Sequence, residues 1–157
     1  MHPLVRFPYA AAGAVTRLVV AISPNGESKF LRAMSARRGR IGAALDAFVR
    51  HCDSVAPGWE FKLEVQGNEG TLTLAEALPM AAFQEFAHEV TLATLDNQTR
   101  SLRGRGALPI RHIELPFTKP PHASEYENLF QGAPVSFDRP VAKVVFDRAL
   151  LDEKVRF

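Results

Sequence analysis

Cysteine is nearly absent from this chain, which has a single one, Cys52, among 157 residues. One cysteine excludes an internal disulfide and fits a reducing compartment. Long apolar runs are missing as well. The most apolar stretch, residues 9–22, is broken by Thr16 and Arg17 and is shorter than the ~20 residues that a membrane-spanning helix needs. Arg17 also interrupts the apolar segment that a signal peptide requires. We therefore expect a cytoplasmic protein with no membrane association.

Charge of one sign is not in excess over the whole chain, but it is unevenly distributed. The formal net charge is +2, made up of +6 over residues 1–50 and −4 over the remainder. A basic segment of this kind can attract nucleic acid or another anionic surface. Its densest part, Arg37, Arg38 and Arg40, lacks the interleaved aromatic residues on which bases stack. A solvated turn is therefore the preferred interpretation, and nucleic-acid binding is the alternative.

The paired groups that catalysis and metal binding require are scarce too. His51 and Cys52 are neighbours on a predicted helix, so their side chains point about 100° apart and cannot form a nucleophile–base pair. No two of the five histidines have the spacing of paired metal ligands on one helix. Glu85 and Glu89 are interpreted as solvation of an exposed helical face. We expect neither an enzyme nor a bound metal or cofactor.

Hydrophobic periodicity predicts the elements of the first half. β-Branched residues indicate a strand over Val15–Ile22, and a short helix is predicted over Glu27–Met34. Ile41–Val55 is predicted to be a helix because apolar residues recur at helical spacing. That apolar stripe consists of Ile41, Leu45, Phe48, Val49 and Cys52.

The next segment predicts a half-buried antiparallel hairpin. Its first strand alternates polar residues with Trp59, Phe61, Leu63 and Val65, and the alternation resumes over Thr71–Leu74. A repeat of two with one apolar face is typical of strands that cover a core on one side. The loop Gly67–Gly70 has glycine at both ends, which permits the positive φ of a hairpin turn.

The second half is predicted to begin with the longest helix. Pro79 suits its first turn, and Gly104 is expected to end it soon after Leu102. Its buried face is predicted from one stripe: Phe83, Phe86, Ala87, Val90 and Thr94. A strand is predicted over Leu108–Leu115, with Ile110 and Ile113 on opposite faces. Ser124 is expected to cap a short helix, and two short strands follow before the chain ends. The sequence thus predicts a single α+β domain, in which a mixed, mostly antiparallel sheet packs against a long helix and shorter helices.

The order of these elements from about Met34 to Leu151 resembles one family of regulator domains. The residues that carry the resemblance are Gly42–Leu45, the hairpin, Phe86–Val90, Ile113–Phe117, and the run Tyr126, Phe130, Ala133–Phe137 and Val145–Leu151. This pattern is similar to the N-terminal arabinose-binding-like domain of AraC/XylS-type transcriptional regulators. That domain binds a ligand and mediates dimerisation.

The resemblance implies a small-molecule effector of unknown identity, a homodimer, and DNA binding only through a helix-turn-helix region that is absent from this sequence. No recognition helix pair follows Leu151, so a truncated regulator, an isolated domain and a stand-alone relative all remain open. The first 33 residues do not match the helical opening expected of the family. We therefore divide the chain into an atypical segment, 1–33, and a regulatory domain, 34–157. A stand-alone interaction module is the alternative to an effector sensor.

Candidate ligand-binding residues come from the long helix and the hairpin. Gln84, His88 and Thr91 form a polar strip about one helical turn apart. If that strip faces the sheet, these groups can orient a ligand over Trp59 or Phe61, because small-molecule sites combine apolar walls with a few convergent polar groups. Arg111 is a further candidate. The competing interpretation is that these polar residues lie on the surface beside the core.

Overall fold

The computed structural model describes residues 39–55, 58–104 and 106–156. In chain order its elements are α3 (Ile41–Val55), β1 (Trp59–Gln66), β2 (Glu69–Glu76), a 3₁₀ turn (Ala81–Phe83), α4 (Gln84–Arg103), β3 (Ile110–Glu114), α5 (Ser124–Leu129), β4 (Val135–Ser136), β5 (Ala142–Asp147) and α6 (Ala149–Asp152). The strand predicted over Val15–Ile22 and the helix predicted over Glu27–Met34 lie outside the described residues.

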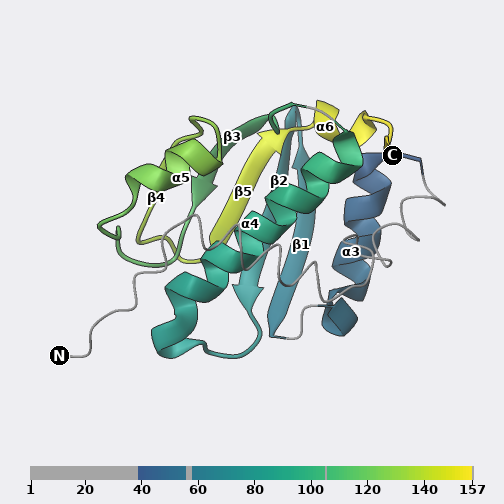
Figure 1. The fold of residues 1–157 in the computed structure, drawn as a ribbon. Coiled ribbons are helices and arrows are strands. Elements are labelled where there is room, and N and C mark those ends of the chain that lie inside the picture. The colour runs from purple at the N-terminus through teal and green to yellow at the C-terminus, as the bar shows by residue number, and fades with distance from the viewer. Residues whose placement is uncertain (1–38, 56–57, 105, 157) are drawn as a thin grey trace, which may run out of the picture.

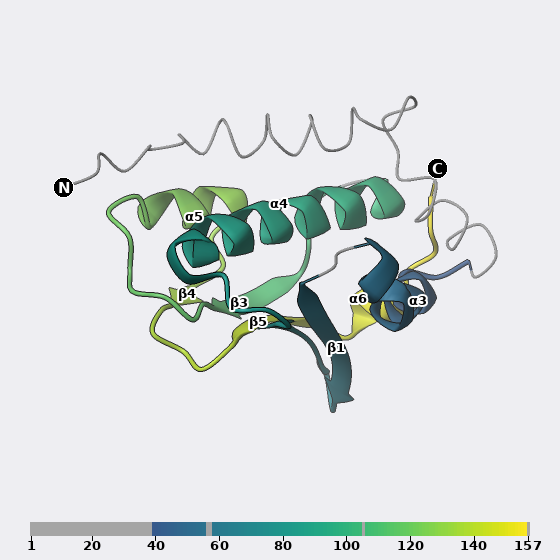
Figure 2. The same ribbon diagram turned by 90° about the horizontal axis from the view of Figure 1, so that it is seen from below.

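The five strands form one mixed sheet in the order β1-β2-β5-β3-β4. All neighbours are antiparallel except β3 and β4, which are parallel. Helices α3, α4 and α5 lie on one side of the sheet, and α4 crosses it diagonally (Figures 1 and 2). This arrangement confirms the predicted α+β class and the single sheet packed against a long helix.

The core lies between the sheet and these helices. The α3 stripe is confirmed: Ile41, Leu45, Phe48 and Cys52 are buried, and Val49 packs against them. The sheet supplies Trp59, Phe61, Leu72, Leu74, Ile113 and Phe146. The rings of Phe48 on α3 and Phe61 on β1 meet edge to face with centroids 4.9 Å apart. Burial of this apolar surface is the main force that joins α3 to the sheet.

The hairpin is confirmed, with a tighter turn than predicted. Only Gly67 and Asn68 separate β1 from β2, and Gly67 has a positive φ of 57°. Gly70 belongs to β2 instead of the loop and pairs with Phe146 on β5. Val65, predicted on the apolar face, is 48% exposed because the turn end of the hairpin extends beyond the helices.

The prediction for the start of α4 is wrong. Pro79 precedes a 3₁₀ turn, and the α-helix begins only at Gln84. Its buried face is also different: Phe83 and Phe86 are exposed, and the buried residues are His88, Leu92, Ala93, Asp96, Thr99 and Leu102. The helix carries two overlapping stripes, and packing against the sheet selected the one that contains Leu92 and Leu102. The predicted end is confirmed, since Gly104 adopts a left-handed φ of 73°.

A β-bulge changes the facing of β3. The pairing with β5 shifts between Ile110 and His112, so that Ile110 lies opposite Phe146 and Ile113 opposite Val144. A bulge inserts one extra residue into a strand and shifts the alternation of faces by one position. Two residues that are an odd number of positions apart, one on each side of the bulge, then point to the same face. Both isoleucines therefore belong to the core side, and their predicted placement on opposite faces is wrong. The predicted cap at Ser124 is wrong as well, because α5 begins at Ser124 itself with no side-chain cap.

The C-terminal residues join the ends of α3 and α4. The Ile41 amide donates to the Glu153 carbonyl (2.9 Å), and the Arg156 amide donates to the Leu102 carbonyl (2.7 Å). Arg103 on α4 forms two hydrogen bonds with the Glu153 carboxylate, at 2.7 and 2.9 Å. Asp147 accepts from the Ala149 amide (2.9 Å) at the start of α6. None of the helices in the described part is long and apolar enough to cross a membrane.

Candidate effector pocket

A cavity of about 50 Å³ lies between α4 and the sheet. Leu92 and Leu95 on α4 form its roof, and Leu72, Val144 and Phe146 form its floor. Helices α3 and α6 contribute Leu45 and Leu150, and Phe130 directly follows the end of α5. Asp96 and Thr99 are the only polar residues of the lining. Apolar walls with very few polar groups are the usual environment of a small-molecule site.

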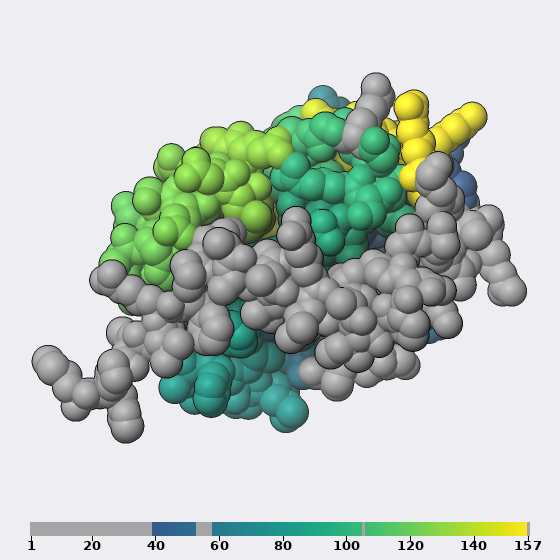
Figure 3. Space-filling model, in the orientation of Figure 1, coloured from purple at the N-terminus to yellow at the C-terminus, as the bar shows by residue number. Residues whose placement is uncertain are grey.

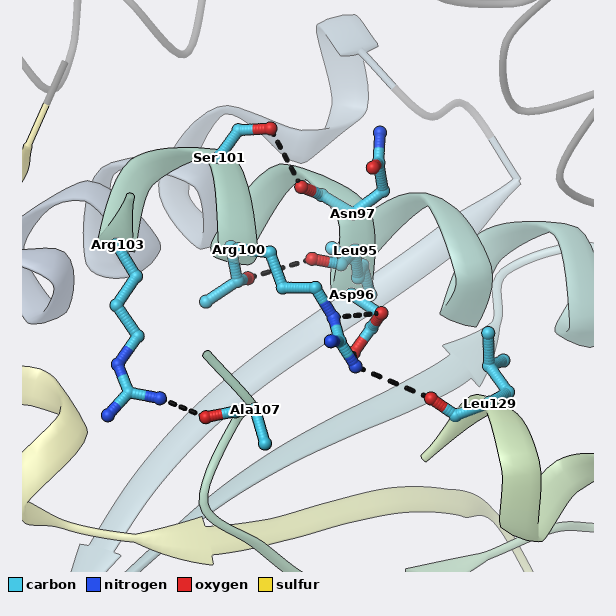
Figure 4. A network of polar contacts seen from close by, with 9 residues as sticks. Leu95, Asp96, Asn97, Arg100, Ser101, Arg103, Ala107 and Leu129 are labelled. Atoms are coloured by element: carbon cyan, nitrogen blue, oxygen red, sulfur yellow. Dashed lines mark hydrogen bonds and ion pairs between the residues drawn. The ribbon is translucent and has the colours of Figure 1, made fainter. Parts of the chain in front are cut away.

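The two polar side chains of this lining are already hydrogen-bonded within the protein. Thr99 Oγ1 donates to the Leu95 carbonyl (2.8 Å), and Asp96 accepts from Arg100 Nε (2.7 Å) and Nη2 (3.2 Å). Arg100 Nη2 also approaches the Leu129 carbonyl at 3.4 Å, so it connects α4 to the end of α5 (Figure 4). Burial raises the pKa of Asp96, and the hydrogen bonds and charge of Arg100 oppose that rise. Because both polar side chains are engaged within the protein, a ligand in this cavity would make mainly apolar contacts.

Three predicted site residues, Trp59, Phe61 and His88, are brought together next to this cavity. The rings of Trp59 and His88 meet edge to face at 4.7 Å, and Trp59 lies 6.4 Å from Phe61. His88 is 1% exposed, so the interpretation that it lies on the surface is wrong. Of the strip on α4, His88 faces the hairpin. The three residues pack closely against one another and do not line the cavity, and their role in ligand binding stays a prediction.

The environment of His88 disfavours the charged form of its imidazole. Burial lowers the pKa of His88, and the Gln84 carbonyl and Glu76 partly counteract this. The His88 Nδ1 atom is 2.8 Å from the Gln84 carbonyl oxygen and 4.0 Å from Glu76 Oε1. That carboxylate oxygen is buried and has no hydrogen-bond partner in the described structure. Gln84 therefore acts through its backbone, and Thr91, the remaining member of the strip, is half-buried.

Arg111 lies at the other end of the sheet. It pairs with Glu69 (3.0 Å) and Asp147 (3.2 Å) on the exposed surface. Glu69 begins β2, whereas Trp59 is paired with Glu76 at the end of β2. Seven residue steps of strand separate them, which corresponds to roughly 23 Å. A ligand that contacts Trp59 and His88 cannot at the same time contact Arg111 unless it is very long.

The basic N-terminal third is only partly within the described structure. Of its arginines, Arg40 pairs with Asp152 (3.3 Å) and Arg50 pairs with Asp46 one helical turn away. The cluster partners Arg37 and Arg38 lie outside the described residues. The two described arginines are thus engaged by carboxylates, and no geometry here favours nucleic-acid binding.

The sequence did not identify the cavity residues on α4 because two different apolar stripes can be drawn along this helix. Leu92, Leu95, Asp96 and Thr99 recur at helical spacing, but the aromatic residues Phe83 and Phe86 suggested the other face. The two leucines at helical spacing were the feature of the sequence that could have indicated the buried face of α4. Apolar residues of β5 and β3 meet them only through the pairing of distant strands, which periodicity does not reveal.

The fold and the cavity together define a small α+β binding domain, and sequence comparison places it in a family. The family model described as the arabinose-binding domain of AraC transcription regulator, N-term, matches residues 30–155. The chain therefore belongs to this family, which is a regulator's sensing domain and not a catalytic family. This confirms the resemblance drawn from the sequence.

A solved structure shows the same fold. The transcriptional regulator CdpR from Pseudomonas aeruginosa is similar with a TM-score of 0.66 and 14% sequence identity, over 99% of this chain and 53% of that chain. At this identity the likeness concerns the fold alone. The present chain spans about half the length of CdpR. No curated protein matches the sequence.

Proposed function

We propose that this domain senses a small effector in the cavity beneath α4 and reports its presence to a DNA-binding region of a cytoplasmic transcription regulator. The observation that carries the proposal is the mostly apolar cavity between α4 and the sheet, to which α3 and α6 also contribute side chains. A site placed between α4 and the sheet is sensitive to small movements of α4. Effector binding changes an equilibrium only through a difference in affinity between two states.

The cavity chemistry favours an apolar effector over a sugar. A pentose needs hydrogen-bond partners for several hydroxyl groups, and leaving them unpaired in an apolar site costs free energy. The lining offers only Asp96 and Thr99, both engaged within the protein. An apolar molecule needs no such partners. A cavity of about 150 Å³ is known to bind benzene, so an effector that exceeds the about 50 Å³ of this cavity must move α4 outward as it enters.

Movement of α4 has a direct route to the C-terminal residues. Arg103 and Leu102, at the end of α4, are bonded to Glu153 and Arg156. In a regulator of this family the DNA-binding region follows the sensing domain, so these contacts are the place where a shift of α4 would reach it. The Arg103–Glu153 pair is half-buried and doubly hydrogen-bonded, which makes the connection stiff.

A homologous series of n-alkanols, from butanol to decanol, tests the pocket and its chemistry. Each added CH₂ group should strengthen binding about fourfold, because burying one CH₂ contributes about 0.8 kcal/mol. Binding to the native state alone raises the melting temperature, which thermal-shift measurement records. Leu95→Phe, which fills the pocket from α4, should abolish the increase with chain length. Leu63→Phe, at a half-buried position that does not line the pocket, is the matched control.

Two outcomes separate the parts of this proposal. If L-arabinose raises the melting temperature and Leu95→Phe removes that effect, the pocket is correct and the apolar effector is wrong. If the alkanols act equally on the wild-type protein and on Leu95→Phe, the pocket itself is wrong.

We also propose that the domain forms a homodimer, as helix-turn-helix regulators do when they bind two half-sites. Leu78, Phe83 and Phe86 are large apolar residues at and before the start of α4 with exposures of 68%, 72% and 41%, and burial of exposed apolar surface is a driving force of subunit association. Sedimentation equilibrium should give twice the 17.3 kDa of one chain, and Phe83→Ser should shift the equilibrium toward the monomer. A wild-type protein that is monomeric at all accessible concentrations would contradict this.

A further inference from the structure

A second polar cluster lies outside the cavity, where the segment before α5 meets the first turns of α4. Glu85 and Glu89 are one helical turn apart on α4, and His122 lies two residues before α5. Each of the three offers a ligand atom within 4.8 Å of the other two. The expectation that both glutamates lie on an exposed face is wrong for Glu89, which is 14% exposed and contacts His122 and Tyr126, whereas Glu85 is 44% exposed. The surfaces of α4 and of the α5 region adjoin in Figure 3.

One of the distances among these atoms equals that of a tetrahedral metal site. Bonds of 2.0–2.2 Å from zinc to nitrogen or oxygen place two ligand atoms about 3.3–3.6 Å apart. His122 Nε2 is 3.6 Å from Glu85 Oε1 and 2.7 Å from Glu89 Oε1. The first distance fits. The second distance is that of a hydrogen bond. A side-chain rotation that moves these two atoms apart by less than about 1 Å would let an ion replace the hydrogen bond.

The surroundings supply the support that a metal site needs. The fully buried Tyr126 donates a hydrogen bond from its hydroxyl to Glu89 Oε1, and such contacts from outside the ligand shell fix the orientation of ligands. Burial raises the pKa of Glu85, the negative charge of Glu89 raises it further, and His122 opposes both. The two carboxylates therefore repel each other in a partly dehydrated place, and a cation would relieve this repulsion.

We propose that Glu85, Glu89 and His122 bind a divalent transition-metal ion, with water as the fourth ligand. The donor set consists of one imidazole and two carboxylates, and the two carboxylates are one helical turn apart. This set suits Zn²⁺, whereas Mg²⁺ and Ca²⁺ prefer sites made of oxygen ligands only. His122 and Glu85 are a third to a half exposed, so the ion is accessible from solvent. Its effect is to fasten the segment before α5 onto α4, which is separate from the apolar cavity.

Calorimetric titration of the untagged full chain at pH 7.5 with ZnCl₂ tests the site, with MgCl₂ as the comparison. We expect one Zn²⁺ per chain, a raised melting temperature and no binding of Mg²⁺. Co²⁺, as a spectroscopic substitute, should give the intense visible bands of a four-coordinate site. His122→Gln should weaken Zn²⁺ binding by at least tenfold and remove those bands, and Tyr126→Phe should weaken it about 10–100-fold, the range for a group that orients a ligand.

The matched control is His112→Gln. His112 also lies beside a glutamate, with Nε2 3.8 Å from Glu114 Oε1, but it has no second carboxylate partner among the described residues, so Zn²⁺ binding should be unchanged. Glu85→Gln, at a half-exposed position, replaces His122→Gln if that variant fails to fold. Absence of Zn²⁺ binding to the wild-type chain, or equal binding to wild type and to the ligand variants, would overturn the proposal.

Discussion

Leu74→Ala should lower the free energy of unfolding by about 2–5 kcal/mol, the range measured when a buried leucine is cut to alanine. Leu74 has no exposed surface and lies in the interior of the sheet, paired with Phe61 on β1 and with Ala142 on β5. Backbone pairing on both sides holds β2 in place, so its neighbours cannot move in to fill the space. Urea denaturation measures the change, and each kcal/mol should lower the melting temperature by about 2–4 °C.

Val65→Ala is the control for that result. Val65 and Phe61 have the same parity on β1, and the sequence alternation places them on one apolar face. In the structure Val65 is 48% exposed, so its truncation should cost less than about 1 kcal/mol. Equal effects of Leu74→Ala and Val65→Ala would mean that the hairpin is not packed against the helices as the structure has it.

This pair of residues illustrates how far sequence periodicity reaches. Alternation correctly identifies the hairpin and the α3 stripe, because local geometry alone fixes which side chains share a face. Alternation does not indicate which part of a strand's apolar face is covered by the helices and which part stays exposed. That boundary depends on the diagonal course of α4 over the sheet (Figure 1), and the position of α4 follows from tertiary packing.

The same limit explains the errors on α4 and β3. The α4 sequence carries an aromatic stripe through Phe83 and Phe86 and a leucine stripe through Leu92 and Leu102, and propensity does not choose between them. On β3 the bulge near Arg111 reverses the parity of every residue after it, and no residue type announces a bulge. The candidate cavity combines both unpredicted features, since Leu92 forms its roof and Ile110 contributes to its lining. The family, by contrast, was evident in the sequence, because element order survives such local changes.

Gly70→Val should destabilise the protein by about 1–3 kcal/mol, as expected for overpacking a well-filled core. Gly70 is in extended β2 and needs no positive φ, so space alone forbids a side chain there. A Cβ at this position would lie 2.5 Å from Cζ of Phe146, and real Cβ contacts are not that short. Phe146 is buried and also lines the cavity. A valine side chain must therefore displace the ring of Phe146 from its place in the cavity lining, so Gly70→Val should also weaken alkanol binding.

A double-mutant cycle distinguishes this steric cause from a general weakening of β2. Phe146→Leu removes the ring atoms that a Gly70 side chain would meet, at its own cost in lost packing. If the clash is the cause, the double variant Gly70→Val with Phe146→Leu should be more stable than the sum of the single effects predicts, by about 0.5–3 kcal/mol. Strict additivity in urea denaturation would show that Gly70 and Phe146 do not touch. The pairing of β2 with β5, and the floor of the proposed effector pocket, would then be wrong.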